Sequence, residues 1–259
     1  MVKNSPLEIN LKTVKDRINE ACAKANREPA EVTLIAVTKS AAPEQIREIL
    51  QLGVGDLGES RAQVVTQKVA QVNEFYQRQK ARGEDAPNLA TRLRWHMIGH
   101  LQRNKVKPIL PLIDLIHSVE SLRLAEEIEV AADKLDRKIP VLLQINASEE
   151  KSKFGVAVGA AVPLAEQIAT MPRLALVGLM TMAPLGATFE EAQAVFCRTR
   201  EIFDEIKWNK IGGAGFRHLS MGMSGDFEAA IAEGATMVRI GTSLFGGKVD
   251  DHPEADEGN

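Results

Sequence analysis

Short runs of apolar, often β-branched residues alternate along this chain with longer stretches in which apolar residues recur every three or four positions. The first pattern is typical of buried strands and the second of amphipathic helices, so their alternation predicts parallel βα units. Eight such runs are present, which is the number of strands in a (β/α)8 TIM barrel. They are Val32–Val37, Val54–Leu57, Leu93–Ile98, Leu112–Val119, Pro140–Ile145, Leu174–Met180, Phe216–Met221 and Thr236–Ile240. A doubly wound open sheet stays the alternative, because a count does not establish closure.

Helical periodicity lies between these runs and once before the first of them. The stretch Leu11–Ala25 predicts an extra amphipathic helix that precedes the barrel. The other predicted helices are Pro43–Leu52, Leu122–Leu135, Val162–Thr170, Glu190–Ile206 and Asp226–Glu233. Together these elements place residues 1–247 in one α/β domain.

Two stretches interrupt the alternation. Arg78–Arg92 is rich in charge and contains Gly83 and Pro87, so we interpret it as a long connection between the second helix and the third strand. Residues 248–259 carry five carboxylates and almost no apolar side chain, which predicts an acidic tail that does not fold.

Composition narrows the classes of partner. Lys and Arg number 32 against 35 Asp and Glu, so charge gives no reason to expect binding to nucleic acid or to an anionic membrane. Cys22 and Cys197 each lie in a helical stretch, which argues for a reducing compartment and against disulfides or a metal site. The polar start of the chain and the absence of a long apolar run predict a cytoplasmic protein.

A lysine follows the first predicted strand. The apolar run Leu34–Val37 leads into Thr38 and Lys39 where a βα loop begins, and in a barrel that end of the strands carries the active site. A solvated strand end explains such a lysine equally well. A functional role therefore requires a partner for the amine.

Two turns near the end of the chain predict a phosphate site. One is His218–Asp226, after the seventh strand, and the other is Gly241–Ser243, after the eighth. Backbone N–H groups made accessible by glycine, with serine hydroxyls and a helix N-terminus, bind phosphate, and barrels often hold it after strands seven and eight. Ser224 and Asp226 alone are also explained as helix caps. The presence of the second turn, after the eighth strand, favours a phosphate site over helix capping alone.

Arg239 lies between apolar neighbours in the last strand. Beside a pyridine nitrogen, its guanidinium would leave that nitrogen unprotonated and make the ring a weaker electron sink. An ion pair with Glu59 or Asp226 is the structural alternative.

Two more polar segments follow the second and third strands. Gly58–Arg61 closes the second strand with polar side chains, those of Glu59, Ser60 and Arg61, that can reach the barrel mouth, although Ser60 could equally cap the next helix. The stretch Trp95–Lys105 places His96 and His100 around a glycine turn, where either ring could pack on a planar cofactor or titrate near neutrality. The residues alone give neither segment a role.

Together these segments resemble the pyridoxal phosphate homeostasis protein family, also called the YggS/PROSC family, over almost all of the chain. The matching motifs, in order, are Ala36–Lys39, Gly58–Arg61, Trp95–Lys105, Ser152–Gly155, Gly178–Pro184, Ser220–Asp226 and Val238–Gly241. Several motifs in one order are more specific than a single glycine loop. The family usually has Asn where this chain has Ser60, so that position is the weaker match.

The resemblance implies a fold type III barrel like the N-terminal domain of alanine racemase, without a C-terminal β domain, that holds pyridoxal 5′-phosphate (PLP) as a Schiff base on Lys39. Ser224, Gly241 and Thr242 would lie at the phosphate, Met223 beside it, and Arg239 at the pyridine nitrogen. The full set of cofactor residues expected is Lys39, Ser60, His100, Ser220, Met223, Ser224, Arg239, Gly241 and Thr242.

Members of this family look like carriers or regulators of PLP that affect vitamin B6 and amino-acid balance, with no established reaction. The resemblance implies a monomer that binds PLP, with PLP-dependent apo-enzymes as partners and no significant turnover. Because the chain ends soon after the eighth strand, we expect a barrel mouth open to exchange with free amines. A slow PLP-dependent amino-acid racemase is the alternative, which an acid–base group such as His96 or His100 opposite the cofactor would favour.

Overall fold

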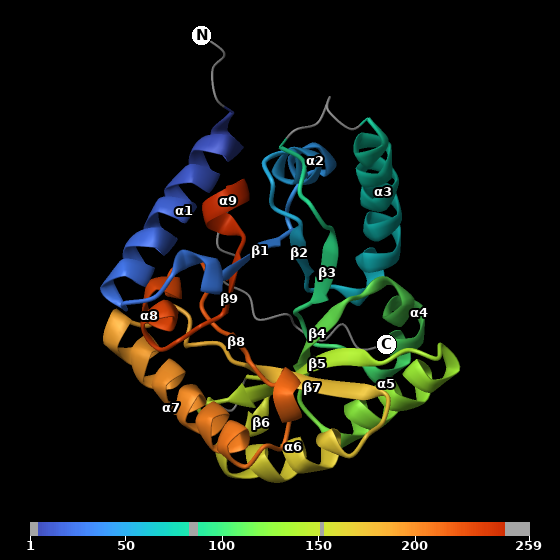
Figure 1. Cartoon of the computed structure of the whole chain (residues 1–259), viewed down its shortest axis with the longest axis vertical. Helices are drawn as coiled ribbons and strands as arrows, with labels where there is room; N and C mark the ends of the chain where they lie inside the picture. The colour runs from blue at the N-terminus through green and yellow to red at the C-terminus, as the bar shows by residue number, and fades with distance from the viewer. Residues whose placement is uncertain (1–4, 83–87, 151–152, 247–259) are drawn as a thin grey trace.

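Eight parallel strands form a closed barrel with helices around its outside in the computed structural model, which describes residues 5–82, 88–150 and 153–246 (Figure 1). The ring order is β4-β3-β2-β1-β9-β8-β7-β5, and pairing of β4 with β5 closes it. The strands are β1 (Thr33–Val37), β2 (Asp56–Glu59), β3 (Arg94–Met97), β4 (Leu115–Val119), β5 (Ile139–Asn146), β7 (Leu174–Met180), β8 (His218–Ser220) and β9 (Met237–Ile240). A two-residue strand, β6 (Val156–Ala157), pairs with the end of β5 outside the ring.

Helices cover the barrel and supply its larger core. They are α1 (Pro6–Lys24), α2 (Pro43–Gln51), α3 (Ala62–Ala81), α4 (Val106–Ile109), α5 (Leu122–Lys134), α6 (Ala161–Ala169), α7 (Phe189–Trp208), α8 (Phe227–Ala232) and α9 (Thr242–Phe245). Single 3-10 turns lie at Pro29–Glu31, Arg103–Lys105, Leu110–Leu112, Val158–Ala160 and Gly213–Gly215. None of the helices in the described ranges combines the length and apolar character needed to cross a membrane.

Helix α1 begins where the sequence provides a cap. The Ser5 hydroxyl accepts a hydrogen bond from the backbone N–H of Glu8 at 3.0 Å, and Pro6 occupies the first turn, where its missing N–H loses no bond. Leu7, Leu11 and Val14 then form a buried stripe, and α1 packs against α8 and α9. The helix therefore packs the start of the chain against the last helices of the barrel.

The interior of the ring is filled only partly by apolar side chains. Five residues from five strands form a cluster separate from the larger core under the helices, namely Ile35, Leu115, Leu142, Met180 and Met237. Strand residues alternate between the two sides of a sheet, and the remaining interior positions include the buried polar residues His96, His117, Ser220 and Arg239. Buried polar side chains inside a barrel can contribute to a functional site as well as to packing.

Every predicted strand overlaps an observed one, and closure of the ring excludes the doubly wound alternative. The prediction was wrong at the start of the Arg78–Arg92 connection, because α3 continues to Ala81. Arg78 and Lys80 lie on its exposed face, while Val72 and Tyr76 are buried and the Tyr76 hydroxyl donates to the carbonyl of Ala90 at 3.0 Å. Residues 83–87 and the predicted tail at 248–259 lie outside the described residues.

Candidate functional site

Polar residues from five neighbouring strands gather at the carboxyl end of the barrel. The ring places β3, β2, β1, β9 and β8 side by side (Figure 1). Lys39 follows β1, Ser60 follows β2 and His100 follows β3. The remaining predicted site residues lie at the ends of β8 and β9, as Ser220–Ser224 and Arg239–Thr242. All nine predicted site residues therefore lie on one arc, although they come from both halves of the chain.

The turn that carries Lys39 is held from behind by buried charge. The Thr38 N–H donates to the Gly58 carbonyl at 2.8 Å, and the Thr38 carbonyl accepts from Lys68 Nζ at 2.9 Å. Lys68, on α3, also forms an ion pair with the fully buried carboxylate of Glu59. This arrangement fixes the backbone at Thr38 and presents Lys39 as an exposed side chain.

Glu59 does not reach the barrel mouth, contrary to the sequence interpretation of Gly58–Arg61. It faces α3, where its carboxylate accepts from the backbone N–H of Ser60 at 2.9 Å as well as pairing with Lys68. Ser60 is not a helix cap, because the N-cap of α3 is Arg61. The Ser60 hydroxyl oxygen is instead buried without a hydrogen-bond partner among the described residues. Leaving such a group unpaired costs about 1–3 kcal/mol, so this atom suits a ligand contact.

The two predicted phosphate turns touch each other. The Ser224 hydroxyl oxygen accepts from the backbone N–H of Ser243 at 3.3 Å, which joins the turn after β8 to the turn after β9. Asp226 is the N-cap of α8, and its carboxylate accepts from the Met223 N–H at 2.5 Å. Asp226 therefore shapes its own turn, while Ser224 bridges to the next strand.

Two glycines in these turns lie close to other chain segments. Gly222 has φ +93°, and a Cβ there would lie 2.6 Å from the Ala230 Cβ. At Gly241 a Cβ would lie 3.3 Å from the Cβ of Val37, the residue two before Lys39. The close approach at Gly241 thus brings the turn after β9 against the end of the strand that carries Lys39.

Arg239 is buried at the mouth end of the barrel, with 3% of its surface exposed. It donates from Nη1 to the Ser220 hydroxyl at 2.7 Å and from Nη2 to the Thr181 carbonyl at 3.0 Å. Burial lowers the pKa of its guanidinium to about 10, so it stays cationic at neutral pH. Within the described ranges it forms no ion pair with Glu59 or Asp226, so that structural alternative is wrong.

Ser220 and His96 are buried in the barrel interior. Ser220 is fully buried, and its hydroxyl oxygen contacts Arg239 and, at 2.8 Å, Nδ1 of His117. His96 is 1% exposed and contacts His117 and Asp56, each at 2.9 Å. His117 was not singled out in the sequence, although a histidine within the apolar run Leu115–Val119 was the available signal.

His100 pairs with a carboxyl group at the end of β4. Its Nδ1 lies 2.9 Å from Glu120 Oε1, close enough for an ion pair, although the contact falls outside hydrogen-bond geometry. The ring stacks on Phe154 with centroids 4.1 Å apart. Burial raises the pKa of Glu120, although the neighbouring His100 opposes the rise. The barrel mouth therefore holds an acid–base pair, His100 and Glu120, of which the sequence analysis identified only His100.

Comparisons with known proteins decide the family. The family model described as alanine racemase, N-terminal domain, matches residues 9–249. The pyridoxal phosphate homeostasis protein of Aquifex aeolicus is 38% identical over 236 residues, which cover 91% of this chain and 96% of the relative. This chain belongs to the pyridoxal phosphate homeostasis protein family. The resemblance seen in the sequence motifs is confirmed.

Solved structures agree with this family assignment. A crystal structure of an unknown protein from Bifidobacterium adolescentis has a TM-score of 0.83 and 36% identity, and covers 92% of this chain and 94% of that one. PipY of Synechococcus elongatus, solved with PLP bound, has a TM-score of 0.72 and 34% identity, and covers 88% of this chain and all of its own. An alanine racemase of Clostridium difficile at 17% identity and a TM-score of 0.67 shows the shared fold alone.

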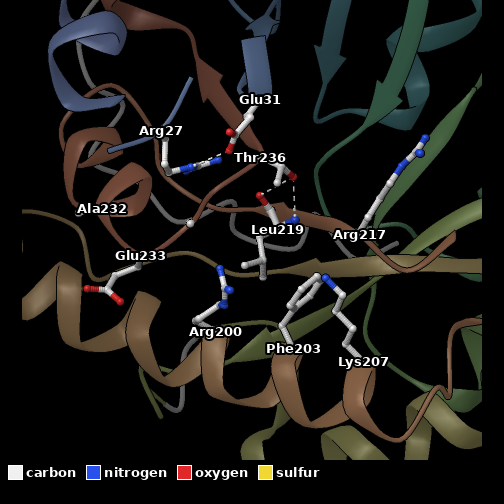
Figure 2. A pocket seen from close by; sticks show the side chains of 11 residues that line it. Arg27, Glu31, Arg200, Phe203, Lys207, Arg217, Leu219, Ala232, Glu233 and Thr236 are labelled. Carbon is white, nitrogen blue, oxygen red and sulfur yellow. Dashed lines mark hydrogen bonds and ion pairs between the residues drawn. The ribbon is translucent and has the colours of Figure 1, made fainter. Parts of the chain in front are cut away.

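A cavity of about 390 Å³ lies at the amino end of the barrel strands, opposite the end that carries Lys39. It is bounded by α7, by the turn before β9 and by the start of β8, and Figure 2 shows Arg27 paired with Glu31 on its wall. Arg200, Lys207 and Arg217 also line it. Because these residues precede β1, β8 and β9, the cavity is separate from the carboxyl-end site.

Proposed function

We propose that this chain binds PLP covalently and reversibly at Lys39 and serves PLP and amino-acid homeostasis without significant turnover. The observation that carries the proposal is the contact of Gly241 with Val37, together with the bond from Ser243 to Ser224. These contacts place Lys39, after β1, beside the predicted phosphate-binding turn after the adjacent strand β9. The PLP-bound structure of PipY, 34% identical, supports the same ligand.

The residues present fit this cofactor. PLP, when bound, supplies an aldehyde that bonds reversibly to primary amines. Lys39 offers the amine, and Ser224 and Thr242 offer hydroxyl and backbone groups to the phosphate. The Arg239 guanidinium would hold the pyridine nitrogen unprotonated, since it keeps its own proton. The unpartnered Ser60 hydroxyl provides a further contact on the same arc.

Exposure of Lys39 supports a carrier rather than a catalyst. An exposed lysine side chain is accessible to amines from solvent or from another protein. We extend the proposal to a monomer that passes PLP to apo-enzymes in the cytoplasm, a compartment supported by the free thiols of Cys22 and Cys197. Activation of a PLP-dependent apo-enzyme by the loaded protein, faster than by an equal amount of free PLP, tests the transfer.

Absorbance spectroscopy tests attachment at Lys39. Wild-type protein titrated with PLP should develop a visible absorbance band distinct from that of free PLP, and Lys39→Ala should not. Lys12→Ala, which removes an exposed lysine of α1, is the matched control and should behave as wild type. An identical band in Lys39→Ala would remove the central claim.

Chiral analysis separates the carrier from the slow racemase. The curated relatives are named for homeostasis, and likeness to alanine racemase at 17% identity shows the fold alone. We expect single-enantiomer amino acids to racemise no faster with the loaded protein than with free PLP. Faster racemisation that is lost in His100→Gln would favour the enzyme instead.

A further inference from the structure

A line of hydrogen bonds crosses the barrel interior from Arg239 to Asp56. It runs from Arg239 to Ser220 at 2.7 Å, on to His117 at 2.8 Å, then to His96 and to Asp56 at 2.9 Å each. Its members come from β9, β8, β4, β3 and β2, and none exposes more than 9% of its surface. The line therefore connects the mouth of the barrel with its opposite end, shielded from water.

With both imidazoles neutral, the direction of the bonds in the line follows from its Asp56 end. The guanidinium of Arg239 can only donate, so the Ser220 oxygen accepts from it and its own O–H can donate to His117 Nδ1. His117 then donates from Nε2 to Nδ1 of His96, and His96 donates from Nε2 to Asp56. Each hydroxyl and imidazole thus donates once and accepts once.

Asp56 fixes the far end as an acceptor. The pKa of its carboxyl group is lowered, because hydrogen bonds from His96 and Arg94 and the charge of Arg94 outweigh the opposing effect of burial. Arg94 Nε donates to the same Asp56 oxygen at 2.6 Å. An ionised carboxylate accepts only, so with two neutral imidazoles each bond in the line points from Ser220 toward Asp56.

We propose that His117 and His96 are positioning residues for Arg239, acting through Ser220, and that the line works only while both imidazoles are neutral. The inference rests on the proposed function, in which the pyridine ring of PLP is the ligand of Arg239. Two of the guanidinium's N–H groups are committed to Ser220 and to the Thr181 carbonyl. Its plane is thereby set before the ligand arrives.

Charge around His117 opposes a second proton on its ring. His96 on β3, Arg239 on β9 and His218 on β8 face it, with Asp56 on β2 and Arg94 on β3 beyond His96. Burial holds the pKa of His117 well below its usual value, and the charge of Arg239 or a proton on His96 or His218 lowers it further. A second proton would turn Nδ1 into a donor facing Ser220 and end the line.

Nitrogen NMR of the histidines in the cofactor-free protein tests the bond directions. At neutral pH, His96 and His117 should each carry a proton on Nε2 and none on Nδ1. A proton on Nδ1 of either ring would overturn the proposal. Because no PLP is present, this result is independent of the proposed function.

PLP titration of variants tests the effect on Arg239. We expect His117→Phe and Ser220→Ala to weaken PLP binding about tenfold, the size of a lost hydrogen bond to a charged group. His117→Gln, which keeps one acceptor and one donor, should restore most of the affinity. On acidification, the wild type should lose affinity faster than His117→Gln, because only the imidazole gains a proton.

A merely structural role predicts a different pattern. Lower stability in His117→Phe with unchanged PLP affinity, or equal acid sensitivity in wild type and His117→Gln, would overturn the proposal. Thr199→Val is the matched control, since it removes a buried hydroxyl that, in the described ranges, bonds within α7, and it should leave PLP affinity unchanged. Failure of the wild type to bind PLP would instead sink the proposed function, leaving the NMR result to decide the line.

Discussion

Lys68 of α3 forms an ion pair with Glu59 of β2, and the carboxylate that it meets is completely buried. The same ammonium group donates to the carbonyl of Thr38, the residue before Lys39. One cation thus satisfies a buried charge and holds the turn that presents the candidate nucleophile.

Removal of this cation should destabilise the fold. Lys68→Met leaves the Glu59 carboxylate buried without its counter-charge, so we expect the free energy of unfolding to fall by about 3 kcal/mol. The control is Lys107→Met, whose 3.8 Å pair with Glu127 is largely exposed and contributes less than about 1 kcal/mol. Urea denaturation measures both variants, and equal losses would show that the Glu59 pair has no special weight.

Gly222 should be far less tolerant of a side chain than Gly186. Both have positive φ, +93° and +72°, so alanine at either position strains the backbone by about 1–2 kcal/mol. A Cβ at Gly222 also meets Ala230 and Phe227, whereas nothing lies within 4 Å at Gly186. We expect Gly222→Ala to lose about 1–3 kcal/mol more than Gly186→Ala in thermal or urea unfolding. Similar losses would contradict the packing argument.

Stability should decline on mild acidification partly through His218. Burial, with the charges of Arg217 and Arg94, lowers the pKa of His218 from 6.5 to about 4. Between these values the unfolded chain binds a proton that the folded protein does not, so the free energy of unfolding falls as pH drops from 6.5 to 4. His218→Gln should show a shallower decline in urea titrations across this range. An unchanged slope would mean that His218 is not protonated on unfolding.

Ser224 should distinguish ligands by their phosphate. If its hydroxyl contacts a phosphate oxygen, Ser224→Ala should weaken PLP binding about tenfold, as expected for a hydrogen bond to a charged group. Binding of pyridoxal, which lacks the phosphate, should stay the same. Thr170→Ala, which removes an exposed hydroxyl at the end of α6, serves as the control in the same fluorescence or absorbance titrations. Equal weakening for both ligands would place Ser224 away from the phosphate.

The barrel could be predicted because each strand is a compact apolar run and the runs number eight. Lys39 and the two turns at Ser224 and Gly241 could be placed together for a similar reason. Each follows a parallel strand, and in a closed barrel all such positions share one end. The distance in sequence between them did not matter once the architecture was known.

Side-chain direction within strands was harder to predict. Glu59 was expected at the mouth, yet Asp56, Gly58 and Ser60 have the interior parity of β2, so the intervening Glu59 must face the helices. Strict alternation would have given this answer. The contact of His117 with His96 and Ser220 could not have been derived, because it depends on the register of three strands around the ring.

The strands β1 and β9 pair in the middle of the arc that carries the candidate site. A ligand held by Lys39 on one side and by the turn after β9 on the other therefore joins the first and the last strand of the chain, which are neighbours in the ring. Such a ligand binds only the closed fold and raises its stability with ligand concentration. The quantity of folded, protease-resistant protein in a cell would then rise and fall with the supply of free cofactor. The lifetime of this protein would therefore depend on the concentration of the cofactor that it is proposed to regulate.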